Sequence, residues 1–513
     1  MSYLATKQAP KREDRLHSCI TFGGTLCGFH KLAGGGCFQD GNREFSQGSI
    51  CLLLPGIAMI NSLKDNVNLL HGAVGCGVCS HSQNANARSG GLSHFGVLKD
   101  ALWLSTALNE ADVIGGGEKK LRSAIIEADR LYRPKTITVV TGCVPGIIGD
   151  DVDGVINDVQ NEVTAKLIPV HCEGFKTKIW ATAYDAVYHG LGRTLLDDPF
   201  FQERLIEEEA QRFRFEEQKK RTVNLLNVSS MGKVDEDELT RLLNDLGLSV
   251  NIFPVFADPE QVYKVKYAAV SISTCPTHDD YFCKFLEESF GIPYILKHMP
   301  IGIENTNDWI REAARFFGRE KAAEKIIRTE NERLGKALEG YRKFFQGKKV
   351  FVSAGEFRAL ATANLLGELG FEIVGVRSFH HDEFAAGEYE KLKKIAGDFS
   401  FNIANAQPFE EANLLERLKP DLFLGHWNGN STSAKLGIAS HVIYNTGLSY
   451  IGYKGVFEIA RRLFRQLRNP AFNKHISKYA RLPYRESWYA EDPFKYIKTP
   501  QGGEKHVRLS GNA

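Results

Sequence analysis

The stretch TITVVTGCVPGIIGDD, residues 136–151, joins a run of β-branched residues to a cysteine and a glycine-rich turn. The run is typical of a buried strand, because Val, Ile and Thr pack well on the pleated surface of a sheet. Cys143 follows this run directly. In α/β sheets, ligands bind beyond the carboxyl ends of the strands, so the stretch predicts chemistry at a strand end.

The same pattern recurs along most of the chain, where short apolar runs alternate with amphipathic helical stretches. This alternation predicts an α/β fold with parallel sheets flanked by helices. Runs such as DELTRLLNDLG and ATANLLGELG predict helices that end at glycine. The predicted strands are 136–142, 165–170, 222–228, 250–256, 268–273, 348–355, 371–376, 421–426 and 441–447.

The length of the chain, 513 residues, is too great for a single core and suits about three domains. Two long charged segments, 202–221 and 307–345, are typical of solvated helices that link domains. The glycine- and cysteine-rich N-terminus is expected to be an arm that wraps another part of the molecule, with a flexible tail as the alternative. We predict this arm at 1–50, three Rossmann-like domains at 51–221, 222–345 and 346–475, and a C-terminal extension at 476–513.

The composition is that of an ordinary soluble globular protein, with 43% hydrophobic and 25% charged residues. The 64 basic and 62 acidic residues leave a formal charge of +2, which favours neither nucleic acid nor an anionic membrane as a partner. The N-terminus has no apolar signal region, and no run of 18 apolar residues occurs. These features predict a cytoplasmic protein without a membrane-spanning helix.

Seven of the ten cysteines fall within the first 143 residues. Such clustering favours metal or redox chemistry over a covalent framework. Cys51, Cys76, Cys143 and Cys275 stand beside turns or strand ends and follow no helical stripe, so core packing explains the set poorly. For any one of them alone, an inert buried cysteine remains the simpler interpretation.

Two of these cysteines, Cys76 and Cys79, stand three positions apart in NLLHGAVGCGVCSHS, residues 68–82. A thioredoxin-type pair opens a helix directly after a strand, whereas the sequence here predicts a glycine-rich loop. A zinc ribbon needs a second close pair, which the sequence lacks. Thiolates at 51, 76 and 143 must be brought together by the tertiary fold, which suits an iron–sulfur cluster held by several loops. The adjacent glycines let the backbone approach such a cluster.

Several motifs resemble those of the nitrogenase superfamily over about residues 45–475. LLHGAVGC is similar to the family motif HGPVGC, GCVPGIIGDDVDGV to C-P-x-G-L-I-G-D-D, and HCEGFKTK to its CEGF segment. STCPTHDDYFCKFLEESFGIPYI resembles the α-subunit segment around a single cofactor-binding cysteine, and FEIARRLFRQLRNP resembles the α-type C-terminal helix. The resemblance implies an α-type subunit with three Rossmann-like domains in an α2β2 assembly.

The resemblance also implies cofactors and partners. Cys51, Cys76 and Cys143 match the ligands of a P-type [8Fe-7S] cluster shared with a β-type subunit, and Cys275 matches the thiolate ligand of a larger iron–sulfur cofactor. Cys79 matches no family ligand. The implied electron donor is an ATP-dependent [4Fe-4S] reductase, the iron protein, near whose docking face the family has a segment similar to residues 102–121. This chain has no GxxxxGK[ST] motif, in agreement with ATP binding to the partner.

Other positions depart from the nitrogenase pattern. The histidine that binds the molybdenum end of the family cofactor falls on Ile451, which cannot ligate a metal, so an all-iron cofactor is expected, with its second ligand absent or supplied from elsewhere. Trp180 and Tyr184 stand close to where dinitrogen reduction uses Gln and His. Tyr184 can donate a proton and Trp180 can reshape the pocket, although simple packing explains both equally well.

The remaining candidate pocket residues lie in predicted strand-end loops. His381 matches a family histidine in an F-x-H segment, and His426 ends the strand DLFLG. Either can contact the cofactor or donate a proton, because histidine titrates near neutral pH, but a lone loop histidine is more often structural. His278, three residues after Cys275, and Arg358, near a family arginine, are predicted cofactor contacts.

These departures leave several functions open. The preferred prediction is a nitrogenase-like methylthio-alkane reductase, which cleaves C–S bonds of small thioethers near Trp180 and Tyr184 and gives methanethiol and a hydrocarbon. A cofactor-assembly scaffold is the alternative, since scaffolds also lack the second histidine. The lost histidine argues against a true nitrogenase, and Cys275 argues against a tetrapyrrole reductase. A metal-free α/β binding module is the last alternative.

Overall fold

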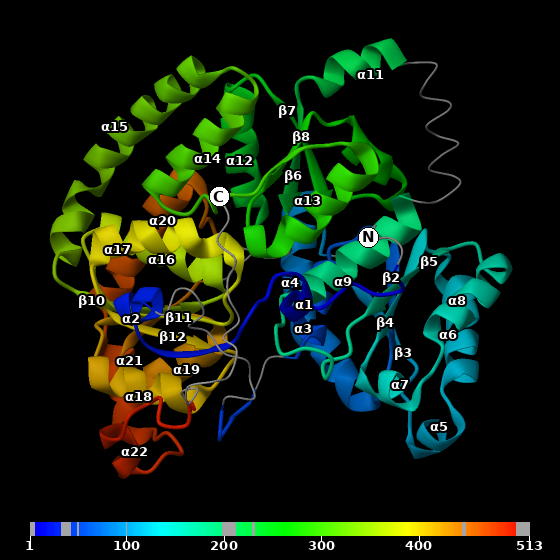
Figure 1. The fold of residues 1–513 in the computed structure, drawn as a ribbon, viewed down its shortest axis with the longest axis horizontal. Helices are drawn as coiled ribbons and strands as arrows, with labels where there is room; N and C mark the ends of the chain where they lie inside the picture. The colour runs from blue at the N-terminus through cyan, green and yellow to red at the C-terminus, as the bar shows by residue number, and fades with distance from the viewer. Residues whose placement is uncertain are drawn as a thin grey trace.

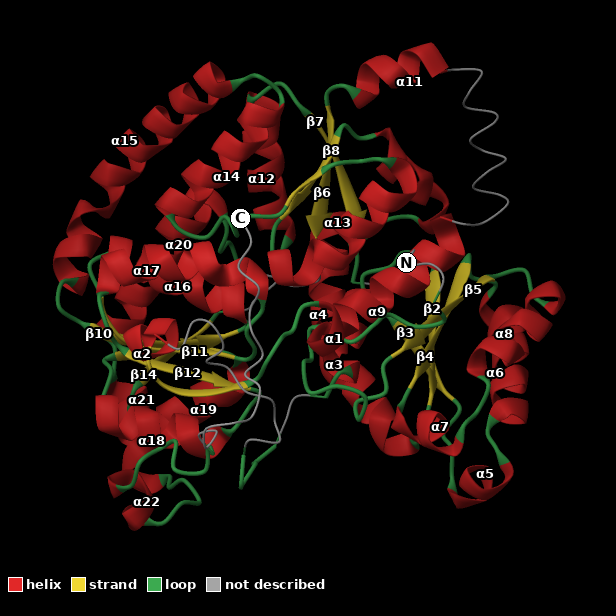
Figure 2. Ribbon diagram, viewed as in Figure 1, coloured by secondary structure: helices red, strands yellow, loops and turns green. Residues whose placement is uncertain are grey.

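A computed structural model describes residues 6–31, 43–48, 51–98, 100–196, 212–227, 231–443 and 448–498. It has three sheets of parallel strands flanked by helices, with one antiparallel strand at the edge of the third sheet (Figures 1 and 2). The predicted α/β fold is therefore confirmed. None of the described helices is long and apolar enough to cross a membrane.

The first sheet has the strand order β3-β2-β4-β5. Its central strand β4 is fully buried, as its run of Thr, Ile and Val predicts. Helix α6 packs on the sheet through Leu121, Ile125 and Ala128, which recur at helical spacing on one face. The elements are β2 (Asn66–His71), β3 (Leu102–Ser105), β4 (Thr136–Thr141), β5 (Lys166–His171), α3 (Leu53–Ile60), α4 (Val74–Phe95), α5 (Glu110–Gly115), α6 (Glu118–Tyr132), α7 (Cys143–Ile148), α8 (Val152–Val159) and α9 (Thr182–Leu191).

The second sheet has the order β7-β6-β8-β9, and its strands are all parallel. Helix α13 follows β8 directly and has a proline in its first turn, where the missing N–H costs no hydrogen bond. The long helix α15 leads from this part of the chain to the third sheet. The elements are α11 (Arg212–Lys219), β6 (Thr222–Asn227), α12 (Lys233–Asp245), β7 (Ser249–Pro254), β8 (Val270–Ser273), α13 (Pro276–Phe290), β9 (Tyr294–Ile295), α14 (Ile303–Phe316) and α15 (Glu320–Phe345).

The third sheet has the order β1-β12-β11-β10-β13-β14. Strand β1 comes from the N-terminal segment and pairs antiparallel with β12, so this segment is built into the third sheet. The domain boundaries at 221 and 345 stay a prediction. The elements are β1 (Thr21–Thr25), α2 (Leu26–Lys31), β10 (Lys349–Ala354), α16 (Glu356–Glu368), β11 (Glu372–Ser378), α17 (Ala386–Ala396), β12 (Ser400–Ala404), α18 (Pro408–Leu418), β13 (Leu422–Gly425), α19 (Trp427–Lys435), β14 (Ala439–Val442), α20 (Gly452–Arg468), α21 (Ala471–Tyr479) and α22 (Glu486–Ala490).

Some sequence predictions need correction. The strands β1, β2, β3, β9 and β12 were not predicted, because they are short or rich in glycine and polar residues. The last predicted strand, 441–447, runs instead over 439–442, and residues 444–447 lie outside the described part. Most of the predicted helix 202–221 also lies outside it, and α11 is its described portion. Cys19 is disulfide-bonded, so the preference for metal or redox chemistry over crosslinks fails for this cysteine.

Candidate functional site

The structure brings the sulfur atoms of Cys51 and Cys143 to the same place, beside Gly174. A Cβ atom added to Gly174 would lie 3.0 Å from Sγ of Cys51 and 3.6 Å from Sγ of Cys143. Cys51 precedes α3, Cys143 opens α7 at the end of β4, and Gly174 follows β5. The absence of a side chain at Gly174 therefore leaves room against both sulfur atoms.

Cys76 lies at the neighbouring strand end, in the first turn of α4. The predicted glycine-rich loop is wrong here, because the helix begins at Val74 and also includes Cys79, whose side chain lies outside the described part. The turns before α4 and α7 touch, since Gly142 donates its N–H to the His71 carbonyl at 2.9 Å. A thioredoxin-type pair lies at the start of a helix that directly follows a strand, as α4 does. The predicted glycine-rich loop therefore no longer argues against a thioredoxin-type pair at Cys76 and Cys79.

Apolar side chains surround these cysteines on the surface. Val74 and Val78 of α4 are 64% and 66% exposed, and Ile147 of α7 is 70% exposed. Phe175, next to Gly174, is half-exposed. Large apolar side chains exposed on neighbouring turns are of the kind that a protein partner covers, so the surface beside the cysteines suits a partner.

A second site is built around Cys275, which caps α13 at the end of β8 and is 3% exposed. Asp279 fixes this turn, because its Oδ2 accepts hydrogen bonds from the Ser273 hydroxyl at 2.9 Å and the Thr274 N–H at 3.2 Å. Burial raises the pKa of the Cys275 thiol to about 12, against the opposing charge of Arg358. A metal ion is the partner that holds such a buried sulfur as a thiolate.

His278 and Tyr184 meet next to Cys275, with ring centroids 4.0 Å apart. The His278 ring is buried, and its Nδ1 makes no hydrogen bond to the described residues. Burial and the charge of Arg358 hold the pKa of His278 well below its usual range, so this ring is neutral at physiological pH. His278 therefore offers a neutral ring nitrogen.

Trp180 and His426 also meet, although they follow different sheets. Their ring centroids are 5.7 Å apart, and Phe379 contacts both, at 5.4 Å from Trp180 and 5.0 Å from His426. The indole Nε1 of Trp180 is buried without a hydrogen bond to the described residues. Burial, with a smaller effect from Arg358, lowers the pKa of His426 to about 4. The rings of Trp180, Phe379 and His426 thus form a cluster, which we call the aromatic wall.

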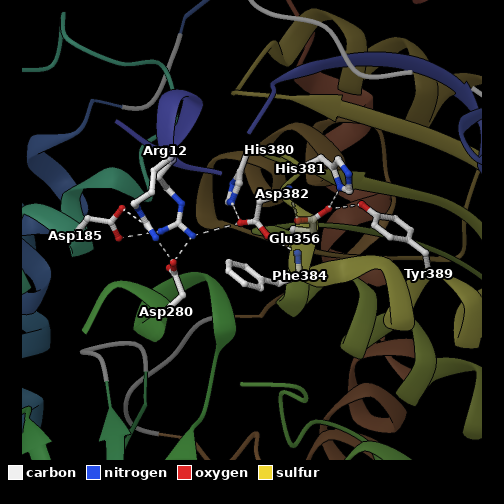
Figure 3. A network of polar contacts seen from close by, with 10 residues as sticks. Arg12, Asp185, Asp280, Glu356, His380, His381, Asp382, Phe384 and Tyr389 are labelled. Carbon is white, nitrogen blue, oxygen red and sulfur yellow. Dashed lines mark hydrogen bonds and ion pairs between the residues drawn. The ribbon is translucent and has the colours of Figure 1, made fainter. Parts of the chain in front are cut away.

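The two adjacent histidines of SFHHDEF have different surroundings (Figure 3). His381 Nδ1 pairs with Glu356 Oε1, which the Tyr389 hydroxyl also contacts. His380 is buried; its Nε2 lies 3.4 Å from Asp382 Oδ2, and its Nδ1 has no hydrogen bond to the described residues. Both histidines follow a predicted strand, but of the two the sequence prediction selects His381 as a site residue, because the doubled histidine does not tell which ring is engaged.

Arg358 acts on Cys275, and Ile451 belongs to the same hydrophobic core cluster as Cys275. Arg358 is buried, its guanidinium lies 5.7 Å from the Tyr450 ring centroid, and its charge acts on Cys275 as well as on the nearby histidines. Ile451 is fully buried in the core, and its N–H donates to Asp235 at 3.0 Å. The aliphatic side chain of Ile451 has no atom that could bind a metal.

Several buried polar atoms in this region lack a partner among the described residues. Leaving such an atom unpaired costs about 1–3 kcal/mol, so their accumulation fits a site that holds a polar or metal-containing group beside the Cys275 sulfur. The atoms are Trp180 Nε1, Thr277 Oγ1, His278 Nδ1 and His380 Nδ1.

Cysteines thus follow strands of the first and second sheets of this α/β protein, near the surface in the first sheet and buried in the second. The chain belongs to the family described as Nitrogenase component 1 type Oxidoreductase, which matches residues 51–468. It is therefore a member of a nitrogenase-type oxidoreductase family.

The similar proteins carry names of two kinds, cofactor biosynthesis protein and nitrogenase alpha chain. The chain is 27% identical over 438 residues to the nitrogenase iron-molybdenum cofactor biosynthesis protein NifE of Methanococcus maripaludis, covering 83% of this chain and 84% of the relative. It is 26% identical over 489 residues to the nitrogenase molybdenum-iron protein alpha chain of Methanosarcina barkeri, covering 84% and 86%. The solved structure of nitrogenase Cp1 at pH 6.5 superposes with a TM-score of 0.69 at 20% identity, over 94% and 99% of the two chains. That superposition supports the fold.

Proposed function

We propose that this chain is the α-type subunit of a nitrogenase-like reductase that cleaves C–S bonds in small methylthio-alkanes. The observation that carries the proposal is the aromatic wall of Trp180, Phe379 and His426, in the region of the buried Cys275. An apolar, polarizable thioether sulfur suits contact with aromatic rings. The buried Ile451, at the position of the nitrogenase histidine, supports a cofactor without that second ligand.

We further propose that Cys51, Cys76 and Cys143 hold a P-type [8Fe-7S] cluster shared with a β-type subunit. The convergence of Cys51 and Cys143 at Gly174 supports this ligand set. The exposed apolar side chains around it supply an interface that such a subunit would cover. A cluster at this place needs further thiolates from the partner, in keeping with the α2β2 assembly proposed for this chain.

The larger iron–sulfur cofactor is proposed to be all-iron and to be bound by the Cys275 thiolate. When bound, such a group supplies electrons at low potential. Arg358 places a positive charge beside the thiolate, and His278 offers a neutral ring nitrogen. Tyr184, in ring contact with His278, is placed to donate a proton or a hydrogen bond to the substrate.

The electron donor is proposed to be an ATP-dependent [4Fe-4S] reductase, the iron protein. Helix α5 lies in the segment that resembles the family docking region, and its Ile114 is 89% exposed. A large apolar side chain in full contact with water is the feature that a docking partner covers. The proposed docking face therefore includes the surface of α5.

A cofactor-assembly scaffold is the second candidate function. It is favoured by the name of the M. maripaludis relative, a cofactor biosynthesis protein, at an identity similar to that of the catalytic alpha chain. The two functions differ in turnover, because a scaffold passes its cluster on and reduces little. A nitrogenase proper is a third candidate.

Turnover of 2-(methylthio)ethanol tests the proposal. The complex purified anaerobically with its β-type partner, given the iron protein and ATP, is expected to release ethylene and methanethiol. The reaction consumes two electrons and two protons, breaks the C–S and the C–O bond, forms the C=C bond of ethylene, and gives water as the third product. The matched control replaces the thioether by dinitrogen and measures ammonia. Iron clusters without C–S cleavage would favour the scaffold, and ammonia as the main product would favour a nitrogenase.

A further inference from the structure

A buried arginine from the N-terminal segment lies where parts of all three sheets meet. Arg12, in helix α1 (Arg12–Arg15), is fully buried. Its guanidinium donates to Asp185 Oδ1 at 2.9 Å, to Asp280 Oδ1 at 3.0 Å and to Asp382 Oδ2 at 3.3 Å (Figure 3). Asp185 belongs to α9, Asp280 to α13, and Asp382 follows β11. A single side chain thus connects elements that flank the first, second and third sheets.

A second arginine shares two of these partners. Arg15 donates to Asp185 Oδ2 at 2.8 Å and also contacts Asp280 Oδ2. Arg15 pairs with Asp185 and Asp280 but not with Asp382. Among the described residues, Arg12 is therefore the arginine whose guanidinium pairs with all three carboxylates. The two arginines therefore differ in one contact, the one to the third sheet.

The three carboxylates stand next to residues of the region around Cys275. Each carboxylate is one or two positions along the chain from a residue of that region. A shift of the carboxylate would therefore also move this neighbouring residue. The adjoining pairs are Tyr184 with Asp185, His278 with Asp280, and His380 with Asp382.

The charges make this arrangement depend on Arg12. Burial acts to raise the pKa of Asp382, but the nearby His380 and the charge of Arg12 hold it well below its usual range. Asp382 is therefore ionised although its side chain is fully buried. Removing one partner of a buried ion pair leaves an uncompensated charge, which is strongly unfavourable. Without Arg12, Asp382 would lose its guanidinium partner, whereas Asp185 and Asp280 would keep their contacts to Arg15. The segment after β11 would therefore lose its link to α9 and α13.

A bound cation is the competing interpretation. Glu356, His380 and Asp382 place possible ligand atoms within 4.8 Å of one another. However, Asp382 Oδ2 already pairs with Arg12, and the two oxygens of Glu356 accept from His381 and from the Asp382 N–H. A cation would have to displace these contacts and lie next to a guanidinium.

We propose that Arg12 is a positioning residue for the site around Cys275, which fixes α9, α13 and the segment after β11 relative to one another. It touches neither substrate nor cofactor and acts through the three carboxylates. This inference rests on the proposed function only for the identity of the group that the site holds. The N-terminal segment is thereby part of the site, although it lies outside the residues matched to the family.

Exchange of Arg12 for lysine tests this role against a matched exchange of Arg15. Arg12→Lys keeps the charge but replaces the planar fork, whose two terminal nitrogens serve Asp185 on one side and Asp280 and Asp382 on the other, by a single ammonium nitrogen. Arg15→Lys weakens the contacts to Asp185, Asp280 and the Tyr281 ring, and it leaves the contact between Arg12 and Asp382 in place. In the full-length chain, purified with its β-type partner from cells that do not supply the larger cofactor, hydrogen–deuterium exchange of residues 379–382 is expected to rise about tenfold in Arg12→Lys and to stay within about twofold in Arg15→Lys.

Equal exchange of residues 379–382 in the two variants would overturn the proposal, as would a uniform rise over the whole chain. The double variant Arg12→Gln/Asp382→Asn removes both charges and is expected to exchange more slowly at 379–382 than Arg12→Gln alone; no such recovery would also overturn it. In the loaded complex, Arg12→Lys is expected to change the EPR line shape of the larger cofactor while its iron is retained. A wild-type complex without any such signal would contradict the proposed function, while the exchange result decides the role of Arg12 independently.

Discussion

Replacement of Cys275 by alanine is expected to remove the larger iron–sulfur cofactor from the complex and to abolish substrate reduction. Cys275 is the cysteine at the end of β8, and the sequence and structure offer no metal-binding side chain at Ile451 to replace it. Loss of even an indirect support of a metal ligand costs about 10–100-fold in affinity, so loss of this thiolate is expected to cost at least about 100-fold. Iron analysis and EPR of the purified complex measure the effect.

Cys283 provides the matched control for this variant. It lies in the same helix, α13, is fully buried, and its pKa is raised well above the usual value by burial. Cys283→Ala is therefore expected to keep the cofactor signal and the activity. Equal loss of the cofactor in both variants, or its retention in Cys275→Ala, would contradict the assignment of Cys275.

Replacement of Cys143 by alanine is expected to remove the cluster proposed at the surface of the first sheet and to weaken the association with the β-type subunit. The cluster would lose a ligand and the interface would lose its shared centre, so iron bound at this site is expected to fall by about 100-fold or more. Gly174→Ala is expected to act in the same direction but more weakly, because its Cβ would lie 3.0 Å from the Cys51 sulfur. Size-exclusion chromatography and the EPR signal of the cluster measure both changes.

Cys27 serves as the control for the surface cluster. It is half-buried in the N-terminal segment, where its N–H bonds to Asp398, and it has no place in the proposed ligand set. Cys27→Ala is expected to leave the cluster signal and the subunit assembly unchanged. A stable complex with a full cluster signal in Cys143→Ala would show that the cluster is held elsewhere.

Much of the fold was predictable because its strands have strong local signals. The run 136–142 predicts β4 to within one residue, since β-branched residues favour a buried strand. Strand β1, TFGGT, has two glycines and gains its place only by pairing with β12, almost 380 residues away in the chain. The turn before α4 also misled the sequence analysis, because glycines disfavour helices locally and tertiary contacts outweigh that preference.

For the candidate sites, the sequence predicts some of the residues but not the contacts that orient them. Strand ends place Cys143 beside Gly174, because β4 and β5 are neighbouring parallel strands that end at one edge of the sheet. Cys51 reaches the same place from the turn before α3, which no strand pattern predicts. The ring orientations of His380 and His381 depend on Glu356 and Asp382, which no periodicity in the sequence indicates. The three partners of Arg12 are 173, 268 and 370 residues away in the chain, so no local sequence pattern predicts that Arg12 is buried.

The central claim is that this chain holds two iron–sulfur centres, one on Cys51, Cys76 and Cys143 and one on Cys275. The most direct test is elemental analysis of the complex purified anaerobically with its β-type partner, with EPR on the same sample. The account predicts abundant iron without molybdenum or vanadium, and two signals that the Cys143→Ala and Cys275→Ala variants remove separately. Iron near zero in an intact, fully assembled complex would contradict it.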